Sequence, residues 1–171
     1  MNIFVLDLCP VIAARHLCDK HVPKMAVETA QMLASAVRRH GATDADMPLT
    51  QAGTPYRGGY HHHPCTVWAG DTCANYQWLA RHGREICHQY EQRFGKVHAC
   101  EGPIIHLAEM EGWMPAIGTK TPHAQAMPDQ YRDTSPVRAY RRYYLAEKAG
   151  FASWDRCIDG PPQWWIDRSA A

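Results

Sequence analysis

The chain has 171 residues, a formal net charge of +1 and an apolar fraction of 46%. This length fits one domain, and this composition is typical of a folded globular protein rather than a disordered one. No apolar run approaches the roughly 20 residues that cross a bilayer, and the near-neutral charge argues against a protein that coats nucleic acid by bulk electrostatics. We therefore expect a single domain over residues 1–171, located in the cytoplasm and without a membrane partner.

The first quarter of the chain predicts two helices joined by a bend. Residues 2–6 are apolar and β-prone, so we expect a short strand or an extended lead-in there. A helix over about 10–20 and another over about 23–40 should follow. Each would begin at a proline, which suits a first helical turn. The segment 18–21 would then lie at the bend, where side chains can converge.

The rest of the chain predicts helices separated by long loops. Enrichment in Gly, Pro, Thr and Asp marks 41–62 as a loop, and helical spacing resumes over about 64–94, with room for a break. A weaker helix is expected at 102–111, followed by a proline-rich irregular connector over 112–136. The last clear helix covers about 136–149. The tail that follows should be irregular and packed down by its own tryptophans. The expected fold class is all-α.

A dense group of titratable side chains lies at the predicted bend and in the helix that follows. Lys20, Lys24 and Glu28 are spaced four residues apart, so they would share one helical face. A lysine that loses its proton is a nucleophile, and a neighbouring carboxylate can transfer protons. The alternative is a solvated face with a Lys–Glu pair of small energetic value. The candidate catalytic residues are Asp19, Lys20, His21, Lys24 and Glu28.

A run of three histidines precedes Pro64. His61, His63 and Cys65 carry side chains that bind zinc or iron, but neighbouring residues of an extended loop point in alternate directions. No HxxxH or CxxC spacing accompanies them. We therefore expect no metal and no cofactor, and a metal site of these three residues is the alternative. His63 would otherwise form a polar wall of a substrate pocket.

The predicted terminal helix carries arginines interleaved with tyrosines. Arg138, Arg141 and Arg142 can share a basic face, and this combination suits phosphate contacts together with base stacking. The alternative is that the tyrosines pack inward while the arginines are solvated.

Other side chains could line a pocket for a flipped base. Trp68 and Trp78 offer stacking faces, although tryptophans at helical spacing more often belong to a core. The further candidates for contact with a substrate are His63, Asn75, His98 and Gln125.

Several blocks of the sequence resemble a known group of small proteins from bacteriophages and environmental sequences. The blocks are MNIFVLDLCPVIAARHLCDKHVPKMAVETAQML, HHPCTVW, NYQWL, FGKVH, AQAMPDQY and AYRRYYLAEKA. Some members of that group are distantly similar to the phage pyrimidine-dimer DNA glycosylases. The resemblance implies an all-helical fold and an N-terminal α-amine as nucleophile, with a glutamate on a nearby helix. In this chain the pair would be the N-terminal amine and Glu28, with arginines on phosphates, and the bulky Asn2 predicts that Met1 is retained.

Together these features predict an enzyme of DNA repair or base modification that acts on a nucleobase or an N-glycosidic bond, in DNA or in a nucleotide. Lys20 or Lys24 would attack the anomeric carbon, or a carboxylate would activate water for that attack. Asp19, His21 or Glu28 would move protons. Two alternatives stay open. One is a metal-dependent hydrolase that uses the histidine run. The other is a non-enzymatic phage-type accessory protein that binds nucleic acid or a host protein. No feature of the sequence predicts an oligomeric state.

Overall fold

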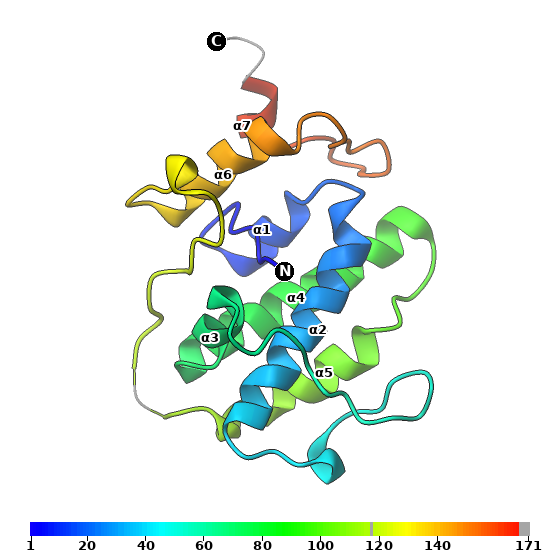
Figure 1. Cartoon of the computed structure of the whole chain (residues 1–171). Coiled ribbons are helices and arrows are strands. Elements are labelled where there is room, and N and C mark those ends of the chain that lie inside the picture. The colour runs from blue at the N-terminus through cyan, green and yellow to red at the C-terminus, as the bar shows by residue number, and fades with distance from the viewer. Residues whose placement is uncertain (117, 168–171) are drawn as a thin grey trace.

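The computed structural model describes residues 1–116 and 118–167, and in these residues it contains seven α-helices and no strand (Figure 1). The predicted all-α class is confirmed. In chain order the helices are α1 (Pro10–Arg15), α2 (His21–Arg39), α3 (Pro64–Ala69), α4 (Cys73–Phe94), α5 (Glu101–Glu109), α6 (Pro136–Glu147) and α7 (Gln163–Ile166). None of these helices in the described ranges is long and apolar enough to span a membrane.

The helices α2, α4 and α5 form the centre of the fold. They contact one another, while α1 packs on α4 and α3 packs on α2. The helices α6 and α7 lie on the other side of the N-terminal segment, which therefore runs between two helical layers (Figure 1). Phe4 lies between the two layers, because its ring packs on His21 of α2 and on Tyr144 of α6. The first residues of the chain thus lie inside the molecule.

Proline and glycine determine most helix ends, as the sequence predicts. Proline occupies the first turn of α1, α3 and α6, and Gly95 ends α4 in the left-handed conformation at φ 67°. The predicted start of the second helix at Pro23 is wrong, because α2 begins at His21. The first N–H groups of a helix have no intrahelical acceptor, so a proline in the first turn breaks no bond. The first helix also ends earlier than predicted, and the bend covers 16–20.

The N-terminal segment is buried but forms no strand in the described structure. Residues 3–6 are almost inaccessible to solvent. Phe4 adopts φ 54°, and its carbonyl accepts the N–H of Leu6 at 2.8 Å. This tight turn breaks the extended conformation that strand pairing needs. Residues 2–6 therefore form a buried lead-in that a turn interrupts, and the predicted strand is wrong for this segment.

Long connections separate the helices, as expected. Among their described residues, the segments 41–62 and 114–135 contain only short 3₁₀ turns as helical structure. The tail contains α7, a short helix that the sequence did not predict. Trp154 and Trp165 are buried and contact the ring of Tyr144, which confirms that tryptophans pack the tail down.

Candidate functional site

The N-terminus lies against a nearly buried carboxylate of α2. Glu28 is only 9% exposed, and its Oε2 accepts the backbone N–H of Asn2 at 2.7 Å. The amine of Met1 lies 3.9 Å from the same oxygen, and Nζ of Lys24 lies 3.7 Å from Oε1. A carboxylate removed from water is costly unless it is paired and hydrogen-bonded. These three nitrogens meet that need, and they place one carboxylate between two amines.

Asn2 anchors the start of the chain in this position. Its side-chain amide donates to the carbonyl of Ala126 at 2.9 Å, and its Oδ1 accepts the N–H of Ile3 at 2.8 Å. Thr66 of α3 donates from Oγ1 to Sδ of Met1 at 3.2 Å. The first two residues are therefore held by the loop before α6 and by α3, in addition to α2.

His63 lies at the edge of this arrangement. Its Nδ1 accepts the N–H of Cys65 at 3.2 Å and so caps α3. Partial burial lowers the pKa of His63, the charge of the N-terminal amine lowers it further, and Glu28 acts in the opposite direction. The imidazole is thus near enough to sense both charges. We call the N-terminal amine, Lys24, Glu28 and His63 the amine–carboxylate site.

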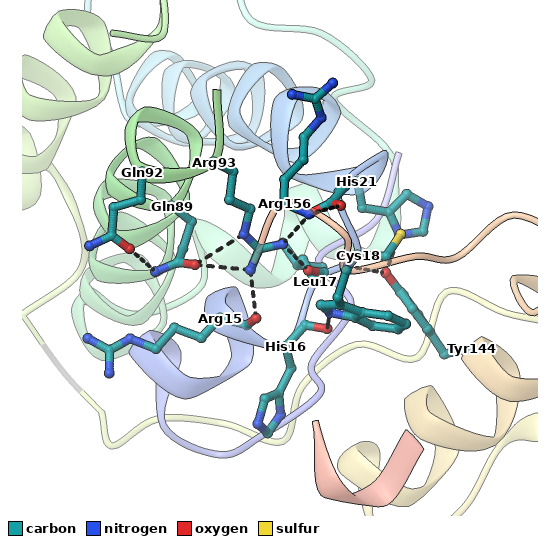
Figure 2. Close-up of polar contacts among 12 residues, drawn as sticks. Arg15, His16, Leu17, Cys18, His21, Gln89, Gln92, Arg93, Tyr144 and Arg156 are labelled. Atoms are coloured by element: carbon teal, nitrogen blue, oxygen red, sulfur yellow. Dashed lines mark hydrogen bonds and ion pairs between the residues drawn. The ribbon is translucent and has the colours of Figure 1, made fainter. Parts of the chain in front are cut away.

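Asp19 belongs to a different polar group. It lies 3.2 Å from the guanidinium of Arg93 through Oδ1, and its Oδ2 accepts the backbone N–H of Arg156 at 2.9 Å. Arg93 also donates to the carbonyls of Leu17 and Arg15 at 2.7 and 2.9 Å (Figure 2). We call this group the Asp19–Arg93 junction. It joins the bend before α2, the end of α4 and the C-terminal tail.

His21 and Lys20 have partners close to this junction. Nδ1 of His21 lies 2.6 Å from Oη of Tyr144, and that hydroxyl accepts the N–H of Cys18. Burial, followed by the charges of nearby lysines, lowers the pKa of His21 to about 4, so the ring is neutral near pH 7 and shares this hydrogen bond with the tyrosine hydroxyl. Nζ of Lys20 lies 4.6 Å from the ring centroid of Phe151. The five candidate catalytic residues thus divide between two groups, and only Lys24 and Glu28 contact each other.

The residues predicted to stack a flipped base are part of the core. Trp68 and Trp78 are buried and pack around the ring of His123. Asn75 is fully buried, and it donates to the Trp68 carbonyl and to Oγ1 of Thr121, each at 2.8 Å. A base could reach these side chains only if the core opened. Base stacking by Trp68 and Trp78 and substrate contact by Asn75 stay predictions, and in this structure the three side chains pack in the core.

The arginines of α6 are bound to carboxylates of the protein itself. Arg138 and Arg142 lie 2.8 and 3.2 Å from Asp133, and Arg141 pairs with an aspartate of the N-terminal segment. Gln125 binds the backbone of the same Asp133 through both its amide atoms. A phosphate would have to compete with these bonds. Contact of these four side chains with DNA stays a prediction.

The residues of the alternative metal site lie in different surroundings. Cys65 is buried against a tyrosine of α6, whereas His61 is exposed and His63 caps α3. Over residues 1–116 and 118–167, no three His, Cys, Asp or Glu side chains are grouped so that they could hold a metal ion. The described geometry thus gives this alternative no support, and it stays a prediction. His98 likewise accepts the N–H of Cys100 at 3.0 Å, one residue before α5.

Reasoning from residue spacing identified Lys24 and Glu28 but missed their neighbours. Asn2 and Thr66 carry no catalytic signature in the sequence, and Glu28 lies 26 residues from the N–H that it binds. Only the family resemblance suggested the N-terminal amine as the partner of Glu28.

Comparison with known proteins gives one result. The family described as pyrimidine dimer DNA glycosylase matches residues 1–101, which is more than half of the chain. The matched part includes every residue of the amine–carboxylate site. Neither the curated proteins nor the solved structures contain a match.

Proposed function

Because the chain belongs to the pyrimidine dimer DNA glycosylase family, we propose that it cleaves the N-glycosidic bond of damaged pyrimidines in DNA at the amine–carboxylate site. The family supports a DNA glycosylase-like function in DNA repair, with DNA as the substrate. One observation carries the assignment of the site: the carboxylate of Glu28 binds the N–H of Asn2 at 2.7 Å with the N-terminal amine 3.9 Å away. This geometry supports the proposal, because covalent catalysis requires a nucleophile beside a proton acceptor.

The proposed first step is attack of an amine on C1′ of the target nucleotide. The nitrogen lone pair forms a bond to C1′ while the bond from C1′ to the base breaks, and the base leaves with that electron pair and a proton from solvent. Glu28 accepts the proton that the amine loses, as a general base. The nitrogen lone pair then breaks the bond from C1′ to O4′, O4′ takes up the proton held by Glu28, and the opened sugar is joined to the protein by a protonated imine. Loss of a C2′ proton from the imine expels the 3′ phosphate by β-elimination.

Two amines flank Glu28, and we assign the attack to the N-terminal one. As a class, α-amines are weaker bases than lysine side chains, so a larger fraction of them carries a free lone pair at neutral pH. The side chain of Lys24 is 65% exposed, whereas Asn2 and Thr66 hold residue 1 in place. Lys24 would then add positive charge beside the phosphates. Lys20, which lies over Phe151, is the least suited of the three amines.

Trapping with borohydride on abasic DNA tests this assignment, because reduction turns the imine into a stable amine. We expect a covalent adduct that mass spectrometry maps to residue 1, and the same spectrum reports whether Met1 is retained. Lys20→Gln and Lys24→Gln should keep the adduct, as should the control Glu91→Gln on the exposed side of α4. An adduct mapped to a lysine would move the nucleophile to that residue. No adduct with the unaltered protein would overturn the proposed chemistry. Cleavage of a duplex that contains a single pyrimidine dimer tests the substrate.

A further inference from the structure

The loop before α3 holds an exposed aromatic ring in a strained backbone. Tyr60 is 67% exposed and adopts φ 53°, a conformation that large side chains rarely adopt. Over the described residues, neither a hydrogen bond nor a ring contact holds its side chain. Packing within the protein therefore does not explain why an aromatic residue stands here.

Ser35 of α2 fixes this loop in place. Its Oγ accepts the N–H of Gly59 at 2.8 Å and donates to the Gly59 carbonyl at 3.1 Å. Gly58, at φ 76°, has no room for a side chain, because a Cβ would collide with Oγ of Ser35 and lie 2.9 Å from its backbone nitrogen. Farther along, the carbonyl of Tyr60 accepts the N–H of His63 at 2.9 Å. The loop is anchored on both sides of Tyr60, which it presents to solvent.

A groove with basic side chains adjoins the loop. It has a volume of about 340 Å³, and its cationic or titratable lining consists of Arg38, Arg39, His61 and His62. Arg38 and Arg39 each make one bond to an aspartate and one to a backbone carbonyl. A guanidinium carries five N–H donors, so each arginine keeps donors for a further anion. Phosphate is an anion of suitable charge and geometry for such donors.

The groove and the amine–carboxylate site are linked through Thr66. Thr66 lines the groove and also contacts the side chain of Met1. Ser35, at the other end, lies seven residues after Glu28 on α2. This spacing is about 10 Å along the helix axis, or about three base steps of a DNA strand. Figure 1 shows the chain that leads into α3 crossing α2 close to the N-terminus. Nucleotides next to one held at Glu28 would therefore lie over the groove.

We propose that Tyr60 and this groove bind the DNA nucleotides adjacent to the target. The ring of Tyr60 stacks on a base, and Arg38, Arg39 and the two histidines contact phosphate oxygens. The proposal rests on the proposed function, since it places the target at the amine–carboxylate site. Glycosylases take the target nucleotide out of the base stack. That movement leaves a neighbouring base with an uncovered face, which an exposed aromatic ring can cover. The strained backbone of Tyr60 then has a reason, because it directs the aromatic ring toward the DNA.

Binding of an inert DNA probe tests the proposal separately from the chemistry. The probe is a duplex with a tetrahydrofuran abasic analogue, which cannot form an imine, and binding is followed by fluorescence anisotropy at several salt concentrations. Tyr60→Ala should weaken binding by about 5- to 100-fold, the range that loss of one base–aromatic stack implies. Tyr60→Phe keeps the ring and should bind within about twofold of the unaltered protein. Arg39→Gln should reduce the slope of log affinity against log salt by about 1.

Matched variants control for loss of exposed apolar surface and of charge. Leu49→Ala removes an apolar side chain that is 58% exposed in the same long connection, and Arg84→Gln removes an exposed arginine of α4. Both should bind the probe as the unaltered protein does. Equal affinity of Tyr60→Ala and the unaltered protein would overturn the proposal, and so would an equal loss in the two controls.

Borohydride trapping of the same variants separates the two hypotheses. If the unaltered protein forms the adduct but Tyr60→Ala binds normally, only the nucleotide subsite fails. If no adduct forms while the binding contrast between Tyr60→Ala and Tyr60→Phe holds, the subsite stands and the proposed chemistry fails.

Discussion

The amine–carboxylate site and the Asp19–Arg93 junction use similar charged groups for opposite purposes. In the junction, the carboxylate of Asp19 and the guanidinium of Arg93 bind each other at hydrogen-bond distance, and together they bind backbone groups of residues 15, 17 and 156. In the site, both amines lie 3.7 Å or more from Glu28, beyond the usual hydrogen-bond length. Neither amine therefore forms a hydrogen bond with Glu28. This difference fits the proposal that the junction holds the fold together while the amine–carboxylate site carries out the chemistry.

Of the proposed variants, Glu28→Gln should separate the amine–carboxylate site from the Asp19–Arg93 junction most clearly. The amide can still accept the N–H of Asn2, but it cannot take up a proton, so we expect the rate of strand cleavage at an abasic site to fall by about 10²- to 10⁴-fold. Single-turnover kinetics on an abasic duplex measures the rate, and a thermal melt should show little change. Glu91→Gln on α4 serves as the control. A cleavage rate near that of the unaltered protein would show that Glu28 is not the proton acceptor.

Arg93→Met should instead lower the stability of the fold and leave formation of the borohydride adduct intact. It leaves the buried carboxylate of Asp19 and two backbone carbonyls without their partner, so the free energy of unfolding should fall by about 3–5 kcal/mol. Urea unfolding measures this loss, with Arg84→Met as an exposed control on the same helix. At low temperature the folded fraction should still form the borohydride adduct. A stable variant without the adduct would contradict the separation of the two regions.

The free energy of unfolding should fall in acid, because the folded protein buries neutral histidines. Burial lowers the pKa of His21 and His82 to about 4 and that of His123 to about 3. The unfolded chain, whose histidines have their ordinary pKa near 6.5, therefore binds these protons more readily than the native state does. The stability contribution is complete above about pH 6.5 and is lost as the pH falls toward the folded values.

At pH 5 the loss should be about 2 kcal/mol for each of these histidines. Urea unfolding at pH 7.5, 6 and 5 measures it. Of the three residues, His21 lies beside the junction, so His21→Gln should reduce the pH dependence by about one third. Equal stability at pH 7.5 and pH 5 would contradict the burial of neutral rings.

The smallest effect should come from Lys24→Gln. The lysine side chain is largely exposed, and such ion pairs contribute less than about 1 kcal/mol. We expect nearly unchanged stability in urea and a retained adduct, with only weaker binding of DNA at low salt. Loss of the adduct in this variant would instead identify Lys24 as the nucleophile.

Local sequence signals predicted the helices well because they depend on neighbouring residues. Prolines at positions 10, 64 and 136 and the glycine at position 95 mark helix ends in the chain and in the structure. The same local logic failed at Pro23, since a proline inside the first turn is indistinguishable in sequence from one that starts it. It also failed for α7, which has only four residues.

The candidate site was harder to predict because its contacts are distant in sequence. The four-residue spacing of Lys24 and Glu28 reveals their pairing, but Asp19 and Arg93 are 74 residues apart. No local pattern distinguishes an aspartate bound to a buried arginine from a catalytic one. Trp68 and Trp78 show the same limit, because their burial depends on the segment that carries His123.

The bond from Asn2 to the carbonyl of Ala126 has a consequence for biosynthesis. Asn2 is among the first residues to leave the ribosome, yet this partner is made 124 residues later. At about 5–20 residues per second, the interval is roughly 6–25 s. During that time Asn2 lacks this anchor, and the N-terminal segment has no α6 to pack against. The last of the contacts that fix the start of the chain therefore forms only after most of the 171 residues have been made.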